Sequence, residues 1–151
     1  MFVLFNRLGL VDTRFAVILA HSTFNLSLVV WMMRGFFADI PAEIDEAAML
    51  DGHTRAGAFM RVVLPLAAPG VAATAVLCFI LSWNEFLYAF ILAAFESRTL
   101  TVGIPGLVTP HGTLWGQVAA VAVVATVPIL VFTALVQKHL VRGLTFGAVK
   151  G

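Results

Sequence analysis

Charged side chains are scarce in this sequence: Asp, Glu, Lys and Arg together account for 11% of the residues. A soluble domain carries about 25% charged residues, and so few charges would not cover its surface. Hydrophobic residues make up 61% of the chain, and the mean hydropathy is +1.01. This composition argues against a soluble domain and indicates a membrane protein.

Other absences narrow the function. The only cysteine, Cys78, has no partner for a disulfide within the chain, and a net charge of +1 leaves no charged tail for nucleic acid. The sequence has no H-E-x-x-H, C-x-x-C or G-x-S-x-G motif and no phosphate loop. We therefore expect a protein that is not an enzyme, binds no metal or cofactor itself and has no nucleic-acid partner.

Three stretches have the length and composition of membrane spans. No formal charge occurs between Arg14 and Arg34 or between Arg61 and Glu85, and a third uncharged stretch follows a segment rich in Gly and Pro. A run of about 18–20 apolar residues crosses a bilayer as a helix. We predict an all-α membrane protein with three transmembrane helices, near 14–33, 68–93 and 115–137.

The positions of Lys and Arg predict the orientation, because cytoplasmic loops are enriched in these residues. More of them lie between the first two spans and in the C-terminal tail (Arg34, Arg55, Arg61, Lys138, Arg142, Lys150) than on the other side (Arg7, Arg14, Arg98). We therefore place the segment between the first two spans and the C-terminus in the cytoplasm, with the N-terminus outside.

Most of the acidic residues lie in the segment 38–64, which has the features of two short helices. Pro41 suits a first helical position, and Gly52 falls where a left-handed cap would end the first helix. A second helix is predicted from Thr54, stopped by Pro65. One interpretation is a hairpin on lipid headgroups. Such helices usually carry a Lys- and Arg-rich face, so the acidic first helix suits a protein socket better.

Residues of this segment resemble the EAA signature of ABC importer permeases, the inner-membrane components of binding-protein-dependent transport systems. The signature residues, at the family's spacing, are Glu46, Ala47, Ala48, Gly52, Val62, Leu64 and Pro65; the family more often has Ile at the position of Val62. The SWNEF stretch, 82–86, and the C-terminal VRGLT and GAVKG, 141–151, resemble the carbohydrate-importer branch of the maltose/glycerol-phosphate type. The resemblance covers the whole chain, 1–151.

Members of this family usually have six spans, and this chain resembles the last three. The sequence leaves open whether Met1 is an internal methionine of a longer reading frame, the start of a truncated gene or the start of a partial chain. Two functions therefore remain. One is a permease subunit of an ATP-driven importer for a sugar or related solute, with a non-sugar solute as the runner-up. The other is a truncated membrane remnant that does not transport.

The resemblance implies a role for each signature residue. Segment 38–64 would be the coupling loop that docks into a dimer of ATPase subunits, which bind the ATP and Mg. Glu46 would make a charge-assisted contact there, Ala47 and Ala48 would allow close approach, and Gly52 would turn the chain. Leu64 and Pro65 complete the motif. The further partners implied are a second permease subunit, an extracytoplasmic solute-binding protein and the lipid of the inner membrane.

Glu85 is the one acid inside a predicted span core, where it costs about 2.5–3.5 kcal/mol. We expect it to share a helix face with Ser82 and Tyr88. These residues are candidates for the translocation path or for interhelical contact, together with Asn84. The first span has a weaker polar face, which we expect to hydrogen-bond to a neighbouring helix: His21, Ser22 and Asn25. Pro128 is expected to kink the third span.

The outside loop from Glu96 to Thr113 contains many helix breakers, among them Gly103, Pro105 and Gly106. We predict no regular structure there. Loops longer than about 12–15 residues are usually functional or disordered. In the resembled permeases the corresponding loop faces the solute-binding protein, and the alternative is a passive linker.

Overall fold

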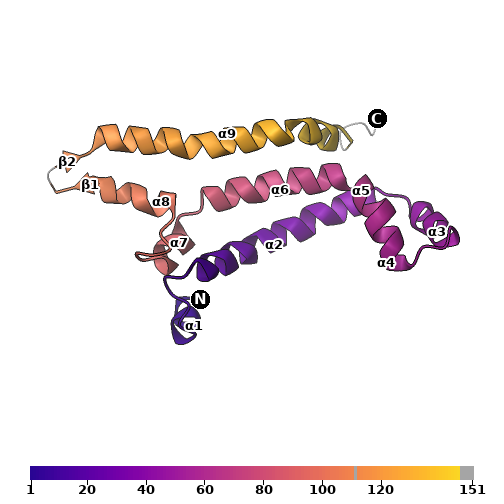
Figure 1. The fold of residues 1–151 in the computed structure, drawn as a ribbon, viewed down its shortest axis with the longest axis horizontal. Coiled ribbons are helices and arrows are strands. Elements are labelled where there is room, and N and C mark those ends of the chain that lie inside the picture. The colour runs from indigo at the N-terminus through magenta and orange to yellow at the C-terminus, as the bar shows by residue number, and fades with distance from the viewer. Residues whose placement is uncertain (111, 147–151) are drawn as a thin grey trace. The chain divides into compact units, whose positions relative to one another are not determined.

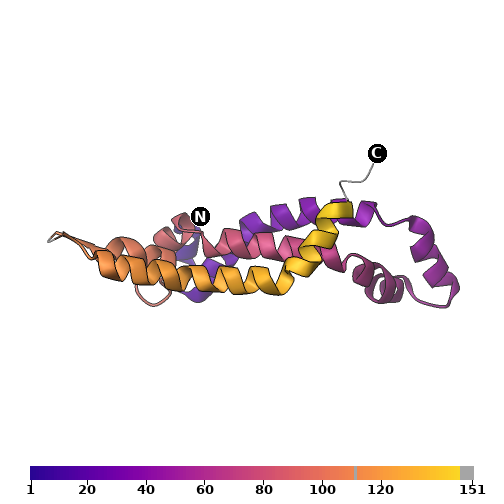
Figure 2. The ribbon, with the colours of Figure 1, turned by 90° about the horizontal axis from the view of Figure 1, so that it is seen from above.

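The computed structural model describes residues 1–110 and 112–146, with the side chains of all of these except 136 and 138–146. It is mostly helical, which confirms the predicted fold class (Figures 1 and 2). The elements are α1 (Phe2–Arg7), α2 (Arg14–Ala38), α3 (Ala42–Leu50), α4 (Arg55–Ala58), η1 (Phe59–Val63), α5 (Leu64–Leu66), α6 (Ala68–Trp83), α7 (Leu87–Leu92), α8 (Leu100–Gly103), η2 (Ile104–Leu107), β1 (Val108–Thr109), β2 (Gly112–Thr113) and α9 (Trp115–Phe146).

The chain divides into two compact units. The first consists of Met1–Leu26 and Phe79–Phe132, and the second of Ser27–Cys78 with the chain from Thr133 onward. The first unit contains the polar residues singled out inside the predicted spans. The second contains the whole of the segment 38–64.

Two helices of the described chain are long and apolar enough to cross a membrane, α2 over Arg14–Ala38 and α9 over Trp115–Leu135. α6 has 16 residues and so rises about 24 Å, less than the ~30 Å of the hydrocarbon core. It qualifies only together with the preceding rod, Arg55–Leu66, from which it is bent by 71°. The described residues thus hold two candidate spans, or three if the bent pair is one span.

The stretch 68–93, predicted as the second span, is not one continuous helix in the structure. α6 ends at Trp83 and α7 begins at Leu87. The side-chain amide of Asn84 donates to the Ile80 carbonyl at 2.8 Å, and the Glu85 carboxylate accepts from N–H groups of α7. Side chains that bond to nearby backbone compete with the helical ladder. The helix is therefore interrupted where these two polar residues follow one another.

The expectation that segment 96–113 has no regular structure is wrong in part. It forms α8 and η2, and β1 then pairs antiparallel with β2, Val108 opposite Thr113 and Thr109 opposite Gly112. The Thr109 hydroxyl donates to the Gly112 carbonyl at 2.8 Å. Gly112 has a φ of +124°, which glycine adopts without steric cost. The glycines and prolines of this segment are therefore compatible with short regular elements.

A small core fixes the N-terminal part of the first unit. Phe5 of α1, Ala16 and Ala20 of α2, and Leu92 of α7 are buried together. The backbone N–H of Asp12 donates to the Leu92 carbonyl at 2.7 Å. This core and hydrogen bond therefore hold α1 and the start of α2 against the end of α7.

α9 continues as one helix through Pro128, so the expected kink stays a prediction. Proline removes one hydrogen bond from the turn before it, and in this turn the Trp83 indole N–H donates to the Ala125 carbonyl at 3.0 Å. The Phe79 ring packs against those of Trp83 and Phe132, at centroid distances of 5.6 and 4.4 Å. Aromatic contacts thereby join α6 to α9 within the first unit.

Candidate functional site

The first helix of segment 38–64 is α3. Pro41 is its N-cap, with φ −59° and ψ 136°, one residue before the position predicted for it. Glu43 and Asp45 lie in the first turn, where the helix dipole favours negative charge. We call residues 38–64 the 38–64 hairpin.

Gly52 ends this helix as the sequence predicted. Its φ is +88°, in the left-handed region that favours glycine. The N–H of Gly52 donates to the Met49 carbonyl at 3.1 Å, and the N–H of His53 donates to the Ala48 carbonyl at 3.2 Å. These two bonds form a Schellman motif. The turn between the two helices is therefore fixed by backbone geometry.

The second helix begins where predicted but does not stop at Pro65. The Thr54 hydroxyl caps it by accepting from the Gly57 N–H at 3.2 Å. The helix then passes through a π-helical turn, Phe59–Val63, and ends at Leu66. Proline clashes with the carbonyl four residues before it in an α-helix, and the wider π turn just before Pro65 relieves that crowding. The sharp change of direction comes at Ala67 instead.

The signature residues differ in exposure. Glu46, Ala47, Gly52 and Pro65 are exposed, Leu64 is half-buried, and Ala48 is buried at 5% exposure. Ala48 therefore packs within the hairpin and does not form part of its outer surface. Leu50, which the sequence reasoning did not single out, is 89% exposed at the end of α3. It lies one helical turn beyond Glu46, so an acid and an exposed apolar side chain share one face.

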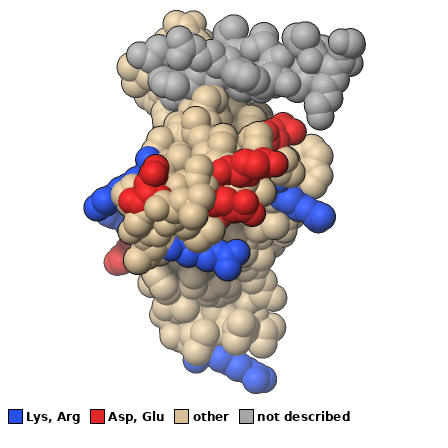
Figure 3. Space-filling view, turned by 90° about the vertical axis from the view of Figure 1, so that its right-hand side faces the viewer, with Lys and Arg blue, Asp and Glu red and all other residues tan. Residues whose placement is uncertain are grey.

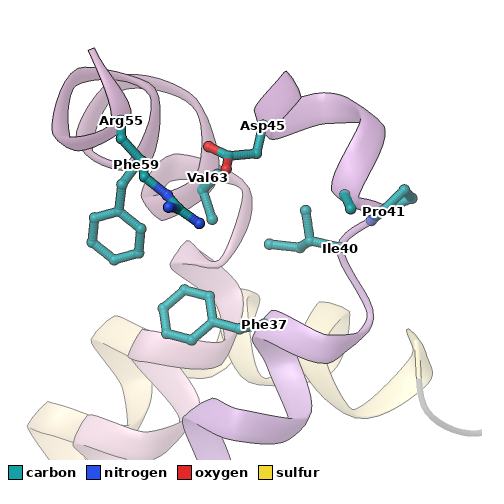
Figure 4. Close-up of a pocket in the computed structure, with 8 residues that line it drawn as sticks. Phe37, Ile40, Pro41, Asp45, Arg55, Phe59 and Val63 are labelled. Carbon is teal, nitrogen blue, oxygen red and sulfur yellow. The ribbon is translucent and has the colours of Figure 1, made fainter. Parts of the chain in front are cut away.

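The outer surface around the hairpin is charged. Figure 3 shows acidic side chains gathered on this face, with basic side chains beside them. Between α3 and the rod lies a hollow of about 300 Å³, lined by Phe37, Ile40, Pro41, Ala42, Asp45, Arg55, Phe59 and Val63. Asp45 and Arg55 approach it from the two helices (Figure 4). The two helices thus enclose an apolar hollow with one acid and one base at its edge.

In the first unit, polar side chains of α2 meet residues around the break between α6 and α7. The Glu85 carboxylate accepts from the N–H groups of Tyr88 at 2.7 Å and Ala89 at 3.0 Å, and it lies 3.3 Å from Nε2 of His21. The Asn25 amide donates to the Ser82 hydroxyl at 2.6 Å. We call His21, Asn25, Ser82 and Glu85 the polar cluster. The expected helix–helix hydrogen bonding of His21 and Asn25 is confirmed.

The expectation that Ser82, Glu85 and Tyr88 share a face of one helix is wrong, because Glu85 lies in the break. Tyr88 is 38% exposed and contributes its backbone N–H to Glu85, while its ring stacks with Phe24 at 6.1 Å. Asn84 is exposed and bonds back to its own helix. Ser22 likewise donates to the Ile18 carbonyl of its own helix at 2.8 Å. Ser82 and Glu85 therefore contact side chains of α2, whereas Asn84 and Ser22 each bond to the backbone of their own helix.

Asp12 is a residue that sequence reasoning missed. Its carboxylate accepts from four consecutive backbone N–H groups, those of Ala94, Phe95, Glu96 and Ser97, at 2.9 to 3.2 Å. The Ser97 hydroxyl donates to it as well, at 3.1 Å. The bond from Phe95, and then those from the other three N–H groups, hold the pKa of the Asp12 carboxyl well below its usual range, although desolvation acts in the opposite direction.

The remaining candidates lie in the outside loop and at the C-terminus. Gly103 ends α8, and Pro105 and Gly106 lie in η2, both exposed. Of the C-terminal resemblance, residues 147–151 lie outside the described residues, as do the side chains of Lys138 and Arg142. Among the described residues, no three His, Cys, Asp or Glu side chains gather as metal ligands would.

These features define a helical membrane protein with a structured two-helix segment between two of its long elements. Residues 1–146 match the family described as binding-protein-dependent transport system inner membrane component. The chain therefore belongs to this family and is a multi-pass component of the inner membrane.

Several relatives of known name are similar over all of this chain. The trehalose/maltose transport system permease protein MalG of Thermococcus litoralis is 38% identical over 100% of this chain and 55% of its own length. The trehalose transport system permease protein SugB of Mycobacterium tuberculosis is 40% identical, over 100% and 56%. The sulfoquinovosyl glycerol transport system permease protein SmoH of Agrobacterium fabrum is 37% identical, over 100% and 53%. The chain spans about half the length of these relatives.

We expect Asp12→Asn to loosen the segment 94–97, because a neutral amide is a weaker acceptor and brings N–H groups of its own. Hydrogen–deuterium exchange of these four amides should become several-fold faster. Glu96→Gln is the control: its side chain is exposed and its backbone N–H stays. Because folding lowers the Asp12 pKa, its stabilisation is complete above the usual value of about 4 and is lost as the pH falls. Equal exchange in Asp12→Asn and the parent at neutral pH would contradict this role.

Proposed function

We propose that this chain is a permease subunit of an ABC importer and that its 38–64 hairpin docks into a dimer of partner ATPase subunits. The observation that carries the proposal is the capped hairpin itself. In a member of the binding-protein-dependent family, a two-helix segment with a fixed turn presents Glu46, Ala47 and Leu50 to the outside. The partner ATPase would bind ATP and Mg, and the 38–64 hairpin of this chain would be the element that its movement displaces.

The chemistry of the hairpin suits such a socket. A charge-assisted hydrogen bond from Glu46 contributes about 1.5–3 kcal/mol once water is excluded. Ala47 has no bulk to hold the partner away, and Leu50 offers apolar area to bury. Ala48 and Leu64 support the hairpin from within, and Pro65 lies just before its link to α6. An interfacial position on lipid headgroups is the competing proposal.

Nucleotide-driven movement would reach the membrane mechanically. The hairpin continues into α2 at one end and, through residues 65–67, into α6 at the other, so a displaced hairpin moves helices on both sides. This is rigid-body switching. It requires that the hairpin and the C-terminus lie in the cytoplasm, as the Lys and Arg distribution predicts. The three spans near 14–33, 68–93 and 115–137, the second of them broken, belong to the same proposal.

We propose that the transported solute is a sugar or a related solute, which the names of the relatives support. The polar cluster, with Asn84 and Tyr88, would lie beside the translocation path. Its hydrogen bonds support interhelical contact, and Glu85 and Ser82 would contribute to the path from the same positions. A non-sugar solute, and a remnant that does not transport, are the alternatives. A second permease subunit and a solute-binding protein complete the proposed assembly.

The outside loop is proposed to face the solute-binding protein. Its short helices and strand pair give it a defined shape, and Asp12 ties the segment 94–97, which leads into the loop, to the start of α2. Gly103, Pro105 and Gly106 lie in the part of this loop beyond the tie. A loop held at its base is suited to presenting a surface to a partner, whereas a passive linker needs no such support.

Gly52→Val should weaken coupling. A β-branched residue at this left-handed position costs about 1–2 kcal/mol in backbone strain, although the space around Gly52 is open. We expect weaker ATPase association or ATP hydrolysis without transport, with membrane insertion unchanged. Gly52→Asn is the matched control, because Asn tolerates this conformation. Binding of the ATPase and sugar uptake in membrane vesicles are the measurements. Normal uptake by Gly52→Val would show that the turn geometry does not matter.

Deleting Gly103 to Gly106 should reduce transport and binding-protein-stimulated ATP hydrolysis together. The deletion removes the end of α8 and most of η2, and with them the proposed contact surface. Basal hydrolysis depends on the hairpin and should persist. ATPase assays of the assembled complex with and without loaded binding protein distinguish the two. If stimulation survives the deletion, the loop is a linker only.

A further inference from the structure

The end of α2 contacts two different elements within the second unit. Phe36 and Phe37 are consecutive, and successive helical residues point about 100° apart. The Phe37 ring lies 5.7 Å from the Phe59 ring of η1, tilted by 50°. The Phe36 ring lies against α6 at Gly70. One turn of α2 therefore touches both the second helix of the hairpin and the helix that follows it.

Gly70 has no room for a side chain. A Cβ placed there would overlap with Cγ and both Cδ atoms of Phe36. Cγ is the root of the ring, so it moves only if the side chain changes rotamer or the helices separate. On the same face of α6, Thr74 is buried at 4% exposure and its hydroxyl lies 3.5 Å from the Met33 sulfur. Small residues at such spacing let membrane helices approach closely.

This contact lies at the base of the hairpin. α2 ends at Ala38, the first residue of the hairpin, and α6 starts directly after the 71° bend that follows the hairpin. Ala67, at the bend, is 3% exposed. The contact between Phe36 and Gly70 thus joins α2 and α6, the two helices that flank the hairpin, at its base.

We propose that Phe36 and Gly70 are positioning residues for coupling: their contact clamps α2 to α6, so that a displaced hairpin moves both helices together. The inference rests on the proposed function, because it assigns the element that transmits the movement. Without the clamp, displacement of the hairpin would change the bend at Ala67, and α2 and α6 would then move by different amounts.

The test measures the separation of the two helices. Spin labels at Trp31→Cys on α2 and Leu77→Cys on α6, both exposed, are introduced with Cys78→Ser. Distance distributions are recorded by double electron–electron resonance in the permease assembled with its ATPase, with and without ATP and Mg. We expect one narrow distribution that ATP leaves unchanged.

Three variants and a control decide the outcome. Phe36→Ala removes the contact without a clash, and we expect a broader distribution that shifts when ATP is added. Gly70→Ala should lengthen the distance already without ATP, and Gly70→Ala combined with Phe36→Ala should reverse that lengthening. Gly35→Ala, which has open space around it, should behave as the parent. A distribution in Phe36→Ala that is as narrow and as insensitive to ATP as the parent's would overturn the clamp.

Failure of the proposed function gives a different result. In that case the ATPase does not bind the parent permease at all. The distances between the spin labels, measured without nucleotide, still test whether Phe36 and Gly70 hold α2 against α6. A parent distribution no narrower than that of Phe36→Ala would then overturn it. If Gly70→Ala fails to reach the membrane, the comparison of Phe36→Ala with Gly35→Ala decides.

Discussion

Inside a bilayer a polar group must find its partner within the protein, because no water is available there. Glu85, which the proposed second span would place in the bilayer, illustrates how this chain would meet that constraint. The carboxylate follows the end of α6 and accepts from the N–H groups of Tyr88 and Ala89 in the first turn of α7, while His21 of α2 lies beside it. The break between α6 and α7 leaves backbone N–H groups that can donate to Glu85, and the Glu85 carboxylate gives those N–H groups an acceptor. Each therefore makes the other tolerable.

Outside the predicted hydrocarbon region the same need is met by local chemistry. Gly52 and Thr54 cap the two helices of the 38–64 hairpin with bonds that stay within a few residues. Such a hairpin keeps its shape when it moves, provided that its base is held. Contacts from Phe36 and Phe37 hold the base. We infer that rigidity here serves transmission, since a flexible hairpin would absorb the displacement it is proposed to pass on.

The sequence predicted best what depends on neighbours along the chain. The helical class, the cap at Gly52 and the start at Thr54 follow from propensity and turn chemistry over a few residues. The break before α7 was missed because hydropathy counts apolar residues and does not see a side chain taking backbone donors. The prediction that Pro65 stops the second helix failed because the sequence carries no signal for the π-helical turn that precedes it. Asp12 bonds to residues more than eighty positions away, and no local pattern indicates such a partner. The fit of Phe36 on Gly70 depends on tertiary packing in the same way.

The central claim is that the outer face of the 38–64 hairpin docks on a protein and not on lipid headgroups. A photo-crosslinking amino acid at Leu50, which is 89% exposed, tests it in membranes containing the assembled transporter. The same amino acid at Trp31, which is 76% exposed on α2, is the control. The account predicts a crosslink from position 50 to the ATPase subunit and none from position 31. A crosslink from position 50 to lipid alone would contradict it.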